Sequence, residues 1–157
     1  MKWFQSLIQN KILIAAVTAW FLAQLIKVIL ELFKGQFKVE RFYGSGGMPS
    51  AHSATVSSLA IACGLVDGFG SVSFAIAGAL ALIVFYDARG VRYQTGQIDK
   101  ILNEYNARLK EEGKEPLCEK ELPEKMGHTL PEIIAGIILG VVTANIVCYL
   151  FINDSAK

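Results

Sequence analysis

The sequence carries little charge and no excess of one sign, since 18% of its 157 residues are charged and the formal net charge is +1. Without a basic surplus there is no general surface for nucleic acid, so nucleic acid is not expected as a partner. The chain also has only three cysteines and two histidines, with no CxxC and no Cys/His metal spacing. That composition lacks the ligand cluster of a divalent metal site, so no metal and no cofactor are predicted.

Apolar residues are abundant instead. They make up 53% of the chain, too large a share for an ordinary soluble fold, and the length suits one domain over residues 1–157. Four apolar segments predict transmembrane helices, the second and third of them short, joined by the turn residues Asp67 to Gly70. These spans cover about residues 12–33, 51–66, 72–86 and 132–152.

Two polar connections, 34–50 and 87–131, separate the spans. Within the second, apolar residues recur at helical spacing and predict an amphipathic helix at the membrane interface or beneath the bundle. They are Ile98, Ile101, Leu102, Tyr105 and Leu109. The predicted fold class is therefore all-α: an integral membrane helical bundle of about four transmembrane helices with a cytoplasmic or interfacial amphipathic helix.

Two local patterns inside the spans bear on packing. Gly136 and Gly140 are spaced four apart and predict a close-packing helix face. Lys27 and Glu31 are also four apart, which favours a pair on one face of the first helix over a functional role.

The basic residues predict the orientation in the cell membrane. Eleven of the fifteen Lys and Arg lie in the two polar connections, and the turn between the second and third spans has none. Because basic loops stay on the cytoplasmic side, these connections are expected in the cytoplasm and both termini outside, in a multi-pass arrangement.

Both histidines lie where a predicted span begins at the cytoplasmic side. His52 follows a glycine turn, Gly46-Gly47-Met48-Pro49-Ser50, and opens a helix, a junction whose free N–H groups and Ser50 hydroxyl favour an anion. His128 is followed four residues later by Glu132, a spacing that lets the carboxylate orient the imidazole.

These strings resemble the type 2 phosphatidic acid phosphatase superfamily, related to vanadium haloperoxidases, and in particular its short divergent bacterial branch. Pro49-Ser50-Ala51-His52 fits the superfamily's Pro-Ser-x-His core. Lys34 and Arg41 have the spacing of its first signature, although Phe42 replaces proline, while Leu122 occupies the place of the arginine in its third. The divergent branch is similar through three strings in order, at residues 46–53, 87–92 and 127–132.

The resemblance implies a role for each site residue. His128 would attack phosphorus to form a phosphohistidine, Glu132 would orient it, and His52 would protonate the leaving alkoxide. The phosphoryl oxygens would be held by Lys34, Arg41, Gly47, Ser50 and Arg92, with Arg89 as a further candidate. Asp87 is expected to have a structural or supporting role, paired with Arg89 or Arg92.

The predicted activity is hydrolysis of a membrane lipid phosphate, with the bilayer as surroundings and the active site facing the cytoplasm. That orientation favours phosphatidylglycerophosphate or a similar phospholipid phosphate of the inner leaflet. One alternative is an undecaprenyl phosphate or pyrophosphate phosphatase, and another is a non-catalytic protein that binds or translocates lipid phosphate. The resemblance implies a six-helix core, larger than four spans, so a homodimer that completes the bundle is a further expectation.

Overall fold

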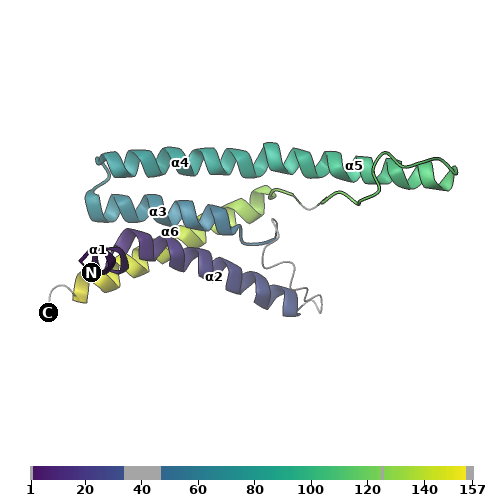
Figure 1. Ribbon diagram of the computed structural model, residues 1–157. Helices are drawn as coiled ribbons and strands as arrows, with labels where there is room; N and C mark the ends of the chain where they lie inside the picture. The colour runs from purple at the N-terminus through teal and green to yellow at the C-terminus, as the bar shows by residue number, and fades with distance from the viewer. Residues whose placement is uncertain (1, 34–46, 125, 155–157) are drawn as a thin grey trace.

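The computed structural model describes residues 2–33, 47–124 and 126–154, and these form helices without any strand (Figure 1). The helices are α1 (Lys2–Ile8), α2 (Lys11–Phe33), α3 (Ala51–Asp67), α4 (Val72–Arg89), α5 (Val91–Glu111) and α6 (Leu130–Asp154). The all-α fold class is therefore confirmed.

Three of the described helical stretches are long and apolar enough to cross a membrane: α2, the rod of α4 and α5, and residues Leu130–Leu150 of α6. Large apolar side chains cover their outer faces, for example Phe21, Ile76 and Ile138, each more than half exposed. An apolar exterior of this extent is what a lipid-facing bundle requires and a soluble protein avoids.

Helix α3 is the centre of the bundle because it packs against α2, α4 and α6. With 17 residues it is shorter than α2, α4, α5 and α6, and it carries three buried serines, Ser53, Ser57 and Ser58. A helix enclosed by its neighbours needs no apolar surface of its own, so the serines are tolerated. The alanines of α2 that meet it, Ala19 and Ala23, are fully buried.

Helices α3 and α6 approach each other most closely at the two glycines that the sequence marks as a packing face. A Cβ built on Gly136 would lie 2.5 Å from the carbonyl oxygen of Ser50 and 2.9 Å from Cβ of Ser53. A Cβ on Gly140 would likewise meet the backbone of Ala54. The predicted close-packing face is therefore present, and it joins the starts of α3 and α6.

The chain direction alternates, so that α2 and α4 end where α3 and α6 begin (Figure 1). The starts of α3 and α6 are also tied directly, since Ser50 N–H donates to the carbonyl oxygen of Glu132 at 2.9 Å. Among the described residues, one end of the bundle thus collects the segments for which the sequence predicts chemistry.

Helix α5 is the predicted amphipathic helix, and it continues the direction of α4 beyond the ends of α2, α3 and α6 (Figure 1). It does not fold back beneath the bundle. Gly90 interrupts the helix, but the backbone hydrogen bonds of a helix continue through it. Gly90 N–H donates to the carbonyl oxygen of Tyr86, and the carbonyl oxygen of Gly90 accepts from Gln94 N–H. The two helices therefore keep one direction. Together α4 and α5 form a rod of about 60 Å at 1.5 Å per residue.

The segment that returns from the tip of α5 to α6 is fastened to α5 by two asparagines. The amide of Asn103 both donates to and accepts from the backbone of Leu122, at 2.9 and 3.0 Å. Asn106 accepts from Leu117 N–H at 2.8 Å. Because the backbone of this extended segment has no sheet partner, side-chain amides supply its hydrogen bonds.

Candidate functional site

The two histidines meet at the end of the bundle where α3 and α6 begin. Their ring centroids are 6.4 Å apart and the rings are perpendicular, at 89°. An attacking nitrogen needs about 3–3.5 Å to its target and a proton donor about 2.6–3.2 Å to its acceptor, so one phosphoryl group fits a gap of about 6–7 Å. The structure therefore brings the two imidazoles next to each other, with a centroid separation comparable to that gap.

His52 lies in the first turn of α3. Ser50, the residue just before this helix, is its N-cap. The Ser50 hydroxyl accepts from Ser53 N–H at 3.3 Å and from the Ser53 hydroxyl at 3.0 Å, and Ser50 is fully buried. The Ser50 oxygen thus holds the start of α3, and phosphate binding by this residue stays a prediction. Gly47, in the exposed turn ahead of it, has the positive φ of 85° that favours glycine.

His128 is fixed by the junction of α4 and α5 rather than by its own helix. Its backbone N–H donates to the carbonyl oxygen of Ala88 at 3.0 Å. Gly127, just before it, has a φ of 77°, and a Cβ there would lie 2.8 Å from the same carbonyl oxygen. Only glycine satisfies both the backbone conformation and the close approach, which explains the Gly-His pair.

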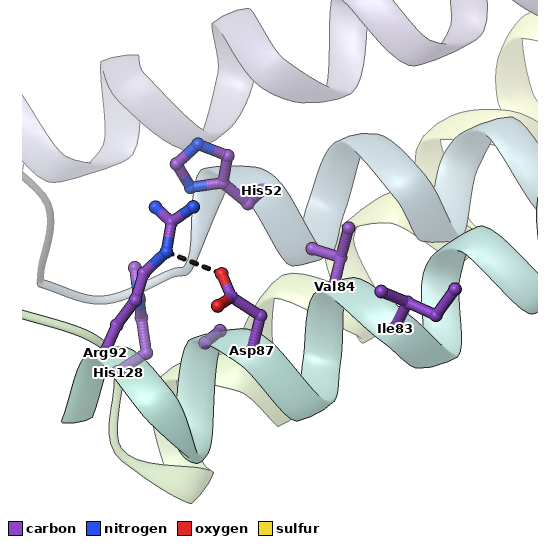
Figure 2. A pocket seen from close by; sticks show the side chains of 7 residues that line it. His52, Ile83, Val84, Asp87, Arg92 and His128 are labelled. Carbon is purple, nitrogen blue, oxygen red and sulfur yellow. Dashed lines mark ion pairs between the residues drawn. The ribbon is translucent and has the colours of Figure 1, made fainter. Parts of the chain in front are cut away.

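A cavity of about 190 Å³ lies between the histidines and α4. It is smaller than the 300–1,000 Å³ of pockets for drug-sized ligands, so a headgroup fits better than a whole lipid. Figure 2 shows its lining, which is polar on one side and apolar on the other. The lining residues are His52, Ile83, Val84, Asp87, Ala88, Arg92 and His128.

Of the two arginines left open by the sequence, Arg92 lines this cavity and Arg89 is not among its lining residues. Nε of Arg92 lies 2.5 Å from Oδ2 of Asp87, so Arg92 is also the described partner of Asp87 (Figure 2). The arginine that lines the cavity therefore comes from the first turn of α5 and its counter-ion from the last turn of α4.

His128 is the buried member of the pair, with 4% of its surface exposed, and its Nε2 has no hydrogen-bond partner among the described residues. Burial first, and the positive charge of Lys27 second, lower the pKa of His128 to about 4. The ring is therefore neutral near pH 7. Most buried polar atoms are already bonded, so an unpartnered nitrogen in a neutral ring is an exception that a functional role would explain.

Glu132 lies close to the pair but bonds elsewhere. Its Oε2 accepts from Thr129 N–H at 2.8 Å, which caps the start of α6. Its charge opposes the lowering of the His128 pKa, so the carboxylate is within electrostatic reach of the ring. The predicted role of Glu132 in orienting the imidazole stays a prediction.

For Lys27 of α2 the sequence favours a pair with Glu31 and predicts no role in the site. Its strongest carboxylate neighbour is Glu132 of α6, ahead of Glu31 on its own helix. Lys27 continues the four-residue spacing of Ala19 and Ala23, whose side chains are buried against α3. That spacing is the signal that could have placed Lys27 on the inner face of α2, toward the histidines.

Two further residues complete the predicted set. Lys34 and Arg41 lie outside the described residues, so their roles stay predictions. Leu122, at the place where the superfamily has an arginine, is bound to Asn103 of α5 and is not among the residues that line the cavity. Among the described residues no group of three or more His, Cys, Asp or Glu side chains forms a metal site.

The apolar bundle is that of a membrane protein, and its two histidines lie on one cavity. The chain belongs to the divergent PAP2 family, whose sequence profile matches residues 8–143. It is also similar to the uncharacterized membrane protein YuiD of Bacillus subtilis (strain 168), with 32% identity over 155 residues, 92% of this chain and 98% of that protein. No solved structure shows significant similarity to the chain.

Proposed function

We propose that this protein hydrolyses a lipid phosphate monoester through a phosphohistidine. The observation that carries the proposal is the pair of imidazoles, 6.4 Å apart, on one cavity that also holds an arginine. Paired titratable groups and a cation in a cavity are rare as structural accidents at a membrane surface.

The two imidazoles differ in exposure, which supports a different role for each. His128 is buried and neutral, so its Nε2 attacks phosphorus while the bond from phosphorus to the lipid oxygen breaks. His52 is exposed and donates its proton to that departing oxygen. Water then attacks the phosphohistidine with His52 as base, which releases inorganic phosphate and restores His128.

Positive charge reaches the cavity from two sides. Arg92 lies on it from α5, and Lys27 of α2 is close enough to lower the pKa of His128. Both favour an anionic phosphoryl group, whose charge grows in the transition state, and losing one such donor typically costs about 3 kcal/mol in the barrier.

The apolar side of the cavity favours a lipid over a water-soluble phosphate. Ile83 and Val84 line the cavity one turn before Asp87, and Ile83 is mostly exposed on the outer face of α4. A phosphate held by the histidines would therefore continue into an apolar wall that is open to the bilayer. An amphiphile satisfies both halves of such a site.

The basic connections favour a cytoplasmic site and external termini. With this orientation the proposed substrate is phosphatidylglycerophosphate or a similar inner-leaflet phospholipid phosphate, ahead of an undecaprenyl phosphate. Lys114→Cys in a Cys118→Ser background tests the orientation, because Lys114 is exposed beyond α5 and the two remaining cysteines, Cys63 and Cys148, are buried. Labelling of intact cells by an impermeant maleimide would contradict it, and labelling only after permeabilisation is expected.

The activity itself is tested with purified protein in detergent and a panel of lipid phosphates. We expect inorganic phosphate release from at least one lipid, reduced by more than 100-fold in His128→Ala and in His52→Ala. Asn145→Ala is the matched control, since Asn145 is an exposed polar residue 17 positions further along than His128. Equal release by the wild type and His128→Ala would end the phosphohistidine mechanism.

A second candidate function is binding of a lipid phosphate without cleavage. It is favoured by Leu122, which supplies no cation where the superfamily has an arginine. Saturable binding of lipid phosphate with no phosphate release from any member of the panel would support this function.

A further inference from the structure

Asp87 and Arg92 form an ion pair that an unbroken helix would not allow. They are five residues apart, which in a continuous α-helix places two side chains about 140° apart around the axis. Nevertheless Nε of Arg92 lies 2.5 Å from Oδ2 of Asp87. The interruption between α4 and α5 must therefore turn the first residues of α5 toward the face that carries Asp87.

Gly90 is the residue at this interruption. It is non-helical, with φ −82° and ψ −90°, and it both ends α4 and begins α5. Its N–H donates to Tyr86 at 2.7 Å, and a Cβ at this position would lie only 2.7 Å from the same carbonyl oxygen. A larger residue would force the backbone apart, so glycine sets the rotation of α5 relative to α4.

The pair leaves the rest of the guanidinium available. Arginine has five N–H donors in a fixed plane, and Asp87 takes the one on Nε. Figure 2 shows the two terminal nitrogens on the side away from Asp87, pointing toward His52. Two parallel N–H groups match two oxygens of a phosphoryl group, and their plane is fixed when Nε is held.

We propose that Asp87 and Gly90 are positioning residues that hold Arg92 over the histidine pair for bidentate binding of the phosphoryl group. This inference rests on the proposed phosphatase function. It differs from a simple neutralising pair, in which Asp87 would compete with phosphate for the arginine. Positioning predicts weaker phosphate binding without Asp87, and competition predicts tighter binding.

The test measures two quantities on detergent-purified full-length protein: the Kd for inorganic phosphate by calorimetry, and kcat and KM for the lipid phosphate that the wild type hydrolyses. We expect Asp87→Asn and Gly90→Ala to raise Kd and KM about tenfold, with a smaller change in kcat. Arg92→Ala is expected to lower kcat/KM by about 100-fold. Asp87→Asn should add nothing in the Arg92→Ala background, because Asp87 acts only through Arg92.

Glu104→Gln is the matched control. It removes the exposed carboxylate that pairs with Lys100 on α5, at 3.9 Å, without touching the cavity. The Asp87–Arg92 pair is itself partly exposed, at 39% and 48%, and such pairs contribute little to folding. Thermal unfolding should therefore be unchanged in Asp87→Asn, which keeps that variant informative even if Gly90→Ala fails to fold.

Two results would overturn the inference: tighter phosphate binding in Asp87→Asn, or additive effects of the Asp87 and Arg92 substitutions. Failure of the proposed function has a different signature. If the wild type binds phosphate but releases none from any lipid, the enzymatic proposal fails, and Kd still tests the positioning of Arg92. If the wild type binds no phosphate at millimolar concentration and releases none from any lipid, both fail.

Discussion

A single methyl group at Gly136 should separate the two histidines. The Cβ of alanine at this position would lie 2.5 Å from the Ser50 carbonyl oxygen, and ordinary contacts begin at 3.4 Å. Helices α3 and α6 must therefore move apart locally by about 0.9 Å along this direction. The same movement would stretch the 2.9 Å hydrogen bond from Ser50 N–H to Glu132.

The expected loss is large for so small a change. A misplacement of about 1 Å between reacting groups costs about 100-fold in rate, so Gly136→Ala should lower kcat/KM by about that factor. Overpacking of this kind also lowers the free energy of unfolding by about 1–3 kcal/mol. Phosphate release from a lipid phosphate in micelles measures the first quantity, and thermal unfolding in the same detergent measures the second.

Gly78→Ala is the control, because it makes the same change where a Cβ would meet no atom within 4 Å. Its activity should equal that of the wild type, and the better helix propensity of alanine should leave stability equal or slightly higher. Full activity in Gly136→Ala would refute the claim that the packing of α3 on α6 sets the distance between His52 and His128.

Three further predictions address the proposed nucleophile His128, the apolar side of the cavity at Ile83, and the segment between α5 and α6 that Asn103 binds. Because the pKa of His128 is lowered to about 4, its ring loses its proton above that pH, so the acidic limb of kcat/KM should fall near pH 4. Lys27→Met should move this limb to higher pH, since the charge of Lys27 contributes to the lowering. Ile83→Ala should reduce kcat/KM for a long-chain lipid phosphate by about tenfold and leave a water-soluble phosphate monoester nearly unchanged. Asn103→Ala should remove both hydrogen bonds to Leu122, speed amide hydrogen exchange there and destabilise the protein by about 1–3 kcal/mol.

Each of these has an outcome that would contradict it. An acidic limb near pH 6.5 that does not move in Lys27→Met would mean that another group titrates. Equal losses for lipid and soluble substrates in Ile83→Ala would remove the apolar wall from substrate selection, and Leu82→Ala, on the exposed neighbouring position, controls for stability. An unchanged rate of amide hydrogen exchange at Leu122 would show that the hydrogen bonds of Asn103 do not hold this residue in place.

The histidine pair could be predicted from the sequence because local rules suffice for it. His52 and His128 each stand at the start of an apolar segment, and alternating segments bring such starts to one end of a bundle. The close contact of α6 with another helix could be predicted for a similar reason. Two glycines four residues apart, Gly136 and Gly140, leave room for a second backbone to approach.

Lys27 and Arg92 could not be placed in the same way. The four-residue spacing of Lys27 and Glu31 is a local rule, whereas the carboxylate that Lys27 interacts with most strongly, Glu132, is more than a hundred positions away. The sequence also left Arg89 and Arg92 open as partners of Asp87. The choice depends on the rotation at Gly90, which is set by tertiary packing at the junction and not by helix periodicity.

The hydrogen bonds of Asn103 and Asn106 hold the connection between α5 and α6 against α5, so its position does not depend on an intact chain at the tip. Asn103 and Asn106 hold residues 117 and 122, and Ala88 holds His128, so the stretch that carries His128 is secured at three points after the tip near Gly113. A protease that cuts the exposed tip would therefore leave two fragments still docked together. The nicked protein should run as two bands in a denaturing gel yet retain its folded form in detergent, because covalent continuity at the tip contributes nothing to where the imidazole lies.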